Sequence, residues 1–399
     1  MTFMNDSSHH DPFSHTELTR SGSKTRGAFG IIVSGGPAPG INSVISSATI
    51  EARNRGFTVK GFKEGFQGIA LREPDSVTEL TIEQVSSISS TGGSLLGTSR
   101  FNPFRSAGTK EQFLRGLHEN NIDKLIVIGG EGSAYLSHQL ARENHGIQVI
   151  HVPKTIDNDL ILPNHYPSFG FETARYAGTK ILDTLRVDAR TTKRWFLVTT
   201  MGRKAGFLAL GLGIASGATL TLVPEEFRQG TTPQEVAQVI FGSLQRRFLS
   251  GRDWGVIVIA EGVLDLLSPE SSKELRECPR DELGRIKYSQ IELGDVIKPE
   301  LQRLCDSVGH PLRLNTKNIG YELRCHPPVS FDVEYTKFLG FGAVRHLLEG
   351  KTDGMVTRTH DALGFQPLSE LVLPDGSIRS RTIDLDSDLY RVARSFMIR

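Results

Sequence analysis

The amino-acid sequence predicts an α/β fold whose sheet is mainly parallel and buried on both faces. Short apolar runs alternate with amphipathic helical segments along most of the chain, and this alternation is typical of βαβ units. The apolar runs end in turns that carry glycine, proline or charged residues, and ligands of open α/β sheets bind at such strand ends. At about 150 residues per domain, 399 residues indicate two or three domains.

The expected strands and helices follow one another in a regular order. Apolar runs of the length of buried strands occupy five ranges: 30–33, 125–128, 149–152, 195–199 and 256–260. Helical segments follow several of these strands, at 41–53, 134–142 and 205–216. The charged segment 268–297 is expected to be a surface insertion or a hinge.

Composition excludes several classes of protein. The chain has 46 Lys and Arg against 45 Asp and Glu, so a net charge of +1 gives no overall attraction to nucleic acid or an acidic membrane. No apolar run approaches the roughly 18 residues of a membrane span. Cys278, Cys305 and Cys325 lack paired spacing, which indicates reduced thiols in a cytoplasmic protein. Residues 1–26 are polar and are expected to be a disordered tail.

Two glycine-rich turns are candidates for phosphate binding. Residues 34–40 (SGGPAPG) follow a strand and open a helix, where backbone amides and the helix dipole face an anion. They match neither the dinucleotide fingerprint nor the Walker loop, so a purely structural turn is an equal alternative. Residues 129–133 (GGEGS) repeat the arrangement and add Glu131, a hard oxygen ligand for a magnesium-bound polyphosphate. A favourable interaction with the helix dipole is the alternative role of Glu131.

A third turn, PKTIDND at residues 153–159, gathers Lys154, Thr155, Asp157 and Asp159 directly after a strand. Two carboxylates two residues apart can divide the work of accepting a proton and contacting a metal. Asp-Asn-Asp is also ordinary turn chemistry, so a structural turn is again the alternative.

Seven motifs resemble those of the 6-phosphofructokinase family and occur in the family's order. They are GGPAPG, GGSLLGTSRFNPFR, GGEGS, PKTIDND, TTMGRKAG, AEG and GYELRCHPP, within residues 30–335. The resemblance implies two similar Rossmann-like α/β/α domains with the active site in the cleft between them. It places donor and Mg²⁺ on residues 27–165 plus about 332–360, and sugar phosphate on residues 166–331 plus about 361–399.

The resemblance also implies roles for individual residues. Asp157 is the general base for the sugar's 1-hydroxyl, and Lys154, Thr155 and Arg203 complete the catalytic group. Mg²⁺ is held by Glu131, where the family usually has Asp, and by Asp159. The donor-binding residues are Gly36, Arg100, Phe101, Arg105, Gly130, Gly132 and Ser133. The sugar-phosphate-binding residues are Thr155, Asp157, Arg194, Met201, Gly202, Arg203, Glu261, Tyr321 and Arg324.

Self-association follows from one of these roles. In the family, the arginine at the position of Arg194 reaches the 6-phosphate bound to a neighbouring subunit. The resemblance therefore implies a homodimer or a homotetramer, with fructose 6-phosphate as the small-molecule partner.

The phosphoryl donor is ATP or pyrophosphate, and the residues point both ways. Gly132 leaves open the space that an Asp fills in pyrophosphate-dependent members, which favours ATP. Lys154 and Tyr321 are typical of pyrophosphate-dependent or long members, although some ATP-dependent members also carry the lysine. We expect ATP, with pyrophosphate as the alternative.

The expected activity is thus that of a glycolytic 6-phosphofructokinase, which forms fructose 1,6-bisphosphate. Two other classes of function are alternatives. One is a non-catalytic regulatory subunit of the same fold, against which the retention of Asp157, Asp159 and Arg203 argues. The other is a nicotinamide-dependent oxidoreductase, against which the missing G-x-G-x-x-G argues.

Overall fold

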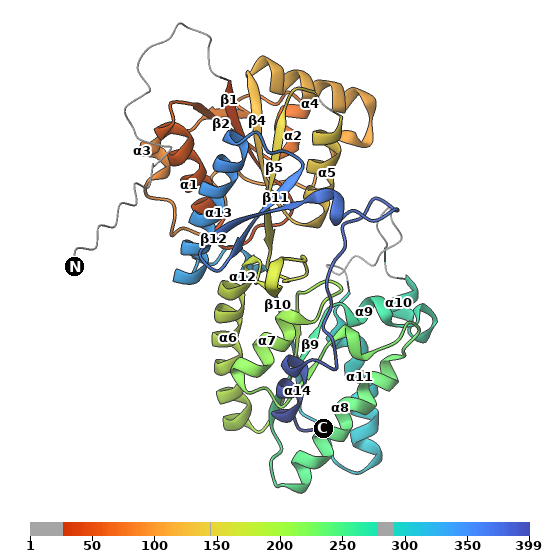
Figure 1. Cartoon of the computed structure of the whole chain (residues 1–399). Coiled ribbons are helices and arrows are strands. Elements are labelled where there is room, and N and C mark those ends of the chain that lie inside the picture. The colour runs from red at the N-terminus through yellow and green to blue at the C-terminus, as the bar shows by residue number, and fades with distance from the viewer. Residues whose placement is uncertain (1–26, 144, 278, 280–290) are drawn as a thin grey trace, which may run out of the picture.

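The computed structural model describes residues 27–399 apart from 144, 278 and 280–290. It contains two mainly parallel sheets, each packed between helices, so the predicted α/β fold class is confirmed (Figure 1). The expected tail of residues 1–26 and Cys278 lie outside the described residues. Cys305 and Cys325 are free thiols. No helix in the described ranges is both long enough and apolar enough to cross a membrane.

The first sheet has eight strands in the order β12-β11-β5-β4-β1-β2-β3, with β6 paired to β5. Its central strands are parallel, whereas β3 and β12 pair antiparallel at the edges. The bounds are β1 Ala28–Val33, β2 Thr58–Phe62, β3 Val77–Glu79, β4 Ile122–Gly129, β5 Gln148–Thr155, β6 Phe169–Gly170, β11 Gly354–Thr359 and β12 Ala362–Pro367.

Helices cover both faces of this sheet because neighbouring residues of each strand point to opposite sides. Ile31 packs toward α1 (Ile41–Asn54) and α13 (Ser330–Leu348), and Ile32 packs toward α4 (Ala107–Glu119). The remaining helices are α2 Phe66–Ala70, α3 Ile82–Val85 and α5 Glu131–Arg142. We call this sheet and these helices the first domain.

The second sheet has the order β10-β7-β9-β8, and all of its strands are parallel. Its strands are β7 Trp195–Thr200, β8 Leu220–Leu222, β9 Gly255–Ala260 and β10 Leu314–Ile319. Its helices are α6 Phe171–Thr192, α7 Phe207–Ser216, α8 Pro233–Leu249, α9 Val263–Leu266, α10 Lys273–Glu277, α11 Leu293–Ser307, α12 Tyr321–Arg324 and α14 Asp388–Ser395. Helices α6 and α7 pack on one face, and α8 and α11 pack on the other. We call this part the second domain.

The C-terminal boundary differs from the expectation that residues from about 361 onward join the second domain. Strand β12 pairs antiparallel with β11 and extends the first sheet. The ring of Phe365 covers Gly354, where an added Cβ would lie 2.1 Å from ring atoms. Leu368, Leu371 and Ile378 are then buried in the first domain. The chain crosses only after these residues, because their apolar side chains would otherwise be exposed.

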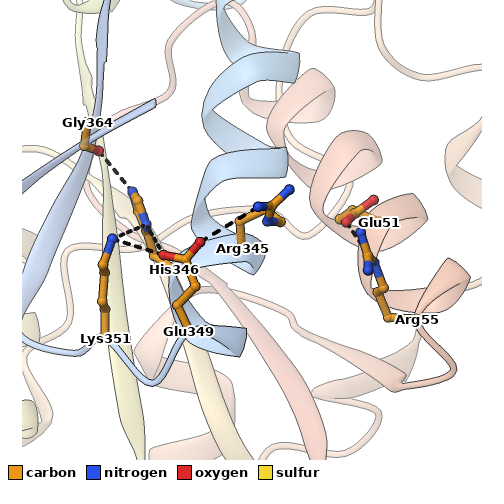
Figure 2. Close-up of polar contacts among 7 residues, drawn as sticks. All are labelled: Glu51, Arg55, Arg345, His346, Glu349, Lys351 and Gly364. Carbon is orange, nitrogen blue, oxygen red and sulfur yellow. Dashed lines mark hydrogen bonds and ion pairs between the residues drawn. The ribbon is translucent and has the colours of Figure 1, made fainter. Parts of the chain in front are cut away.

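The buried imidazole of His346 links β12 to α13, as Figure 2 shows. Its Nε2 lies 3.0 Å from the carbonyl oxygen of Gly364, and its Nδ1 lies 3.2 Å from Nζ of Lys351. A carbonyl oxygen can only accept, so Nε2 carries the proton and Nδ1 accepts from the ammonium group. Glu349 adds an ion pair to Lys351 at 2.9 Å.

We predict that His346→Ala lowers the free energy of unfolding by about 1–3 kcal/mol, because it leaves the Gly364 carbonyl without its buried donor. Urea denaturation followed by circular dichroism measures the change. The control is Glu111→Ala, which removes an exposed ion pair with Arg115 and should cost less than about 1 kcal/mol. Equal effects of the two variants would show that the His346 link does not stabilise the domain.

Candidate active site

A cavity of about 350 Å³ lies at the carboxyl ends of β1, β4 and β5. These strands are neighbours in the first sheet, and their parallel register brings the three predicted turns to one edge. The turns after the three strands form the wall of the first domain. Arg203 and Arg324 of the second domain also line the cavity, which therefore lies between the domains.

The turn after β1 brings backbone close to the cavity. Gly40 precedes α1 with φ +104°, and an added Cβ would lie 2.7 Å from Thr336, so only glycine fits there. Gly36 lies against the guanidinium of Arg324, at 3.4 Å from its added Cβ position to Cζ. The ammonium group of Lys154 donates a hydrogen bond to the Gly36 carbonyl. This turn is thus held between two cations.

The turn after β4 opens helix α5 at Glu131. The Glu131 carboxylate lies 3.8 Å from the guanidinium of Arg203 across the cleft. An added Cβ at Gly132 would meet no atom within 4 Å, so the space beside this glycine is open. Gly130, Gly132 and Ser133 all line the cavity.

The turn after β5 carries the two acids of the site. Burial, followed by the neighbouring carboxylate of Asp159, raises the pKa of Asp157 to about 7. Burial also raises the pKa of Asp159, while Arg203 opposes that rise. The Asp157 amide donates to the Thr155 hydroxyl at 3.0 Å, which fixes the turn. Asp157 is therefore a carboxyl group that can change protonation state near neutral pH.

Four cations surround these acids. Burial, reinforced by Arg324, lowers the pKa of Lys154 to about 7. Arg100, Arg203 and Arg324 contribute the other three positive charges. A cluster of like charges of this kind favours an anionic ligand, because the anion offsets the mutual repulsion of the cations.

A second cavity of about 330 Å³ lies at the carboxyl ends of β7, β9 and β10. Met201, Glu261 and Tyr321 are among its lining residues. One carboxylate oxygen of Glu261 accepts from the amides of Gly202 and Arg203 at 3.3 and 3.2 Å. Within the described part of the chain, no lysine or arginine lines this cavity.

The structure brings most of the predicted site residues together. The first cavity is lined by Gly36, Arg100, Phe101, Arg105, Gly130, Glu131, Gly132, Ser133, Lys154, Thr155, Asp157, Asp159, Arg203 and Arg324. Arg324 thus lies on the donor side, although the resemblance implies a contact with the sugar's 6-phosphate. Its guanidinium stacks over the ring of Tyr321 at 5.4 Å.

Arg194 lies apart from both cavities within one chain. It precedes β7, whereas Met201 follows that strand, and six residues of strand span about 20 Å. The Arg194 guanidinium lies 3.7 Å from Asp188 instead. A contact between Arg194 and a sugar phosphate would therefore have to involve another copy of the chain.

Asn102 and Tyr135 are among the lining residues that were not predicted. Asn102 lies inside the SRFNPFR segment, between predicted donor-binding residues, and this position in the sequence could have indicated that it lines the cavity. Its side chain accepts from the amide of Phe104 at 2.8 Å and caps a short helical turn. Tyr135 lies one helical turn after Glu131 on α5 and carries no motif of its own.

Comparison with known proteins identifies the family. Residues 28–347 match the phosphofructokinase family model. The chain belongs to the phosphofructokinase family. It is 44% identical over 380 residues to pyrophosphate–fructose 6-phosphate 1-phosphotransferase of Thermotoga maritima, covering 93% of this chain and 90% of that protein. It is 34% identical over 342 residues to ATP-dependent 6-phosphofructokinase of Corynebacterium efficiens, covering 86% and 92%.

The fold of this phosphofructokinase-family chain also matches a solved structure. Phosphofructokinase from Saccharomyces cerevisiae superposes with a TM-score of 0.68 at 24% sequence identity, over 86% of this chain. This chain spans 45% of the yeast chain, so the likeness shows the shared fold.

The acids of the first cavity fit a magnesium ion bound together with phosphate. Asp157 and Asp159 are carboxylates whose ionisation burial disfavours, and a divalent cation would offset that cost. Among the residues that the structure describes, no three His, Cys, Asp or Glu side chains form a metal-binding group. Magnesium commonly takes one or two carboxylates and completes its shell with waters and phosphate oxygens, so this donor set is sufficient.

We predict that Asp157→Asn stabilises the protein at about pH 8 and does so less at about pH 5. The Asp157 pKa near 7 in the folded state exceeds its ordinary value of 3.8. Its contribution to stability is therefore lost as pH rises between these two values, and asparagine removes the loss. Thermal denaturation at both pH values measures the difference. The exposed Asp75→Asn serves as control and should show no such pH dependence. If Asp157→Asn melted at a lower temperature than the wild type at about pH 8, the raised pKa of Asp157 would be contradicted.

Proposed function

We propose that this protein transfers a phosphoryl group to the 1-hydroxyl of fructose 6-phosphate and forms fructose 1,6-bisphosphate. The proposal is carried by one observation: the half-buried Asp157 carboxyl shares a cavity with the glycine-rich turns and cations of the first domain. The names of the two relatives support the same reaction. One is a pyrophosphate–fructose 6-phosphate 1-phosphotransferase, and the other is an ATP-dependent 6-phosphofructokinase.

In this mechanism Asp157 accepts the proton of the 1-hydroxyl. The hydroxyl oxygen then forms a bond to the terminal phosphorus of the donor, and the bond from that phosphorus to its bridging oxygen breaks. A base with a pKa near 7 is suited to this step at neutral pH. Arg203, Arg324 and Lys154 stabilise the negative charge on the phosphoryl oxygens and on the leaving group.

Magnesium would be held by Asp159 and Glu131, with Asp157 close by. When bound, it neutralises charge on the donor phosphates. The Glu131 carboxylate lies 3.8 Å from Arg203 and lines the same cavity as Asp159, which supports a role for both acids in holding a phosphate-bound cation.

We propose ATP as the donor because the space beside Gly132 is open, as an α-phosphate requires. Pyrophosphate is the second candidate. It is supported by the buried Lys154 ammonium group, which can offset a pyrophosphate or phosphate leaving group, and by the 44% identity to a pyrophosphate-dependent relative.

We further propose that the protein works as a homodimer or homotetramer. The second cavity, for the sugar, is lined by no lysine or arginine among the described residues, although its ligand carries a phosphate. Arg194 lies at the opposite end of β7, where it can serve a neighbouring copy. Such an arrangement would supply the missing positive charge.

The reaction is tested with purified protein, fructose 6-phosphate and Mg²⁺, with ATP in one assay and pyrophosphate in the other. We expect turnover of the wild type with ATP, and a kcat of Asp157→Asn lower by about 10²–10⁴-fold with similar KM values. Formation of fructose 1,6-bisphosphate is the readout. Wild-type protein that is inactive with both donors would refute the activity and favour a regulatory subunit.

Donor choice is tested at Gly132. We predict that Gly132→Asp lowers the ATP-dependent rate by at least about 10²-fold and affects pyrophosphate less, because its carboxylate would face the α-phosphate. Gly132→Ala is the matched control, since a methyl group meets no atom within 4 Å. An unchanged ATP-dependent rate in Gly132→Asp would show that this space does not hold the α-phosphate.

A further inference from the structure

Residues 379–399, which we call the C-terminal strap, run from the first domain to the second (Figure 1). The strap begins beside the turn that carries the two acids. Ser380 pairs antiparallel with Leu160, and the amide of Arg381 donates to the carbonyl oxygen of Asp159 at 2.8 Å. This part of the chain therefore contacts the backbone of the turn that carries Asp157 and Asp159, which we call the acidic turn.

The side chain of Arg381 adds further contacts to the same turn. Its Nε donates to the carbonyl oxygen of Asn158 at 2.7 Å, and its Nη1 donates to that of His165 at 3.4 Å. Asn158 stands between the two acids with φ +57°, a conformation that non-glycine residues seldom adopt. Arg381 thus donates to the carbonyl group of the residue in this turn that has a left-handed backbone.

Arg381 also contacts the second domain. Its guanidinium lies over the ring of Phe207, the first residue of α7, at 4.7 Å. Two residues further along, the amide of Ile383 donates to Glu225 at 2.8 Å, and the same oxygen accepts from the amide of Gly206 at 3.0 Å. Gly206 follows Arg203 by three residues, so the strap connects the acidic turn to the loop of Arg203.

The end of the strap is anchored on the second domain. Glu226 accepts from the hydroxyl of Tyr390 and pairs with Arg399. The amide of Ile398 donates to the carbonyl oxygen of Thr219 at 2.9 Å. Because this end is fixed, a contact at Arg381 constrains where the acidic turn lies relative to the second domain.

We propose that Arg381 is a positioning residue for phosphoryl transfer, which holds the turn of Asp157 and Asp159 in place opposite Arg203. The inference rests on the proposed function. A base displaced by about 1 Å can lose about 10²-fold in rate, so a residue that fixes this turn affects turnover without touching substrate. Arginine suits the task because its planar fork serves two carbonyl groups and stacks on an aromatic ring, which lysine cannot match.

The test compares Arg381→Ala, Arg381→Lys and the exposed Arg379→Ala, whose side chain lies two residues away on the strap. We expect Arg381→Ala to lower kcat by about 10²-fold, with KM for both substrates within about twofold of wild type. Arg381→Lys should retain more of the turnover, and Arg379→Ala should match wild type. If Arg381→Ala does not fold, Arg381→Lys takes its place: a kcat below that of Arg379→Ala supports the positioning role, and an equal kcat overturns it.

Hydrogen exchange gives a second readout that does not need activity. In substrate-free protein, the amides of residues 155–168 should exchange faster in Arg381→Ala than in Arg379→Ala. Inactive wild-type protein would refute the proposed reaction, while faster exchange would still support the positioning role. Unchanged kcat together with unchanged exchange would overturn the inference, as would a rise in KM alone.

Discussion

The crowding of like charges at the carboxyl ends of β1, β4 and β5 is the constraint on which the rest of the site depends. Asp157 and Asp159 lie two residues apart in one turn, and burial raises the pKa of both because it disfavours the ionised carboxylates. Burial and the positive charge of Arg324 disfavour the protonated form of Lys154 and lower its pKa. The site can hold all of these groups only because acids and cations interleave, and a phosphate donor with its metal would complete that balance.

Both domains contribute charged groups to this balance. The first domain supplies the acids, the glycine-rich turns and the cations Lys154 and Arg100, and the second supplies Arg203 and Arg324 across the cleft. Glu261 organises the second side, because one of its oxygens accepts from two amides of the Arg203 turn. Relative placement of the domains therefore matters as much as the identity of any side chain, and the C-terminal strap is one segment that contacts both.

Prediction from the sequence worked where the signal was local. The apolar runs at 30–33, 125–128 and 195–199 are strands because buried parallel strands need continuous apolar residues. It was wrong at the C-terminal boundary, where Phe365 covers Gly354 and β12 extends the first sheet. Strand β12 has no alternation of buried and exposed residues that would show which sheet it joins, and its place depends on how the folded chain packs.

The sequence by itself determined the α/β class, the three turns at the strand ends and the family to which their motifs belong. It could do so because glycine, proline and charged residues at strand ends impose turns and chemistry over a few positions. Only the tertiary structure decided that Arg324 faces Gly36, that Arg194 lies away from both cavities, and that Arg381 contacts the acidic turn. Long side chains carry no local signal of their partners, because those contacts arise from packing between distant segments.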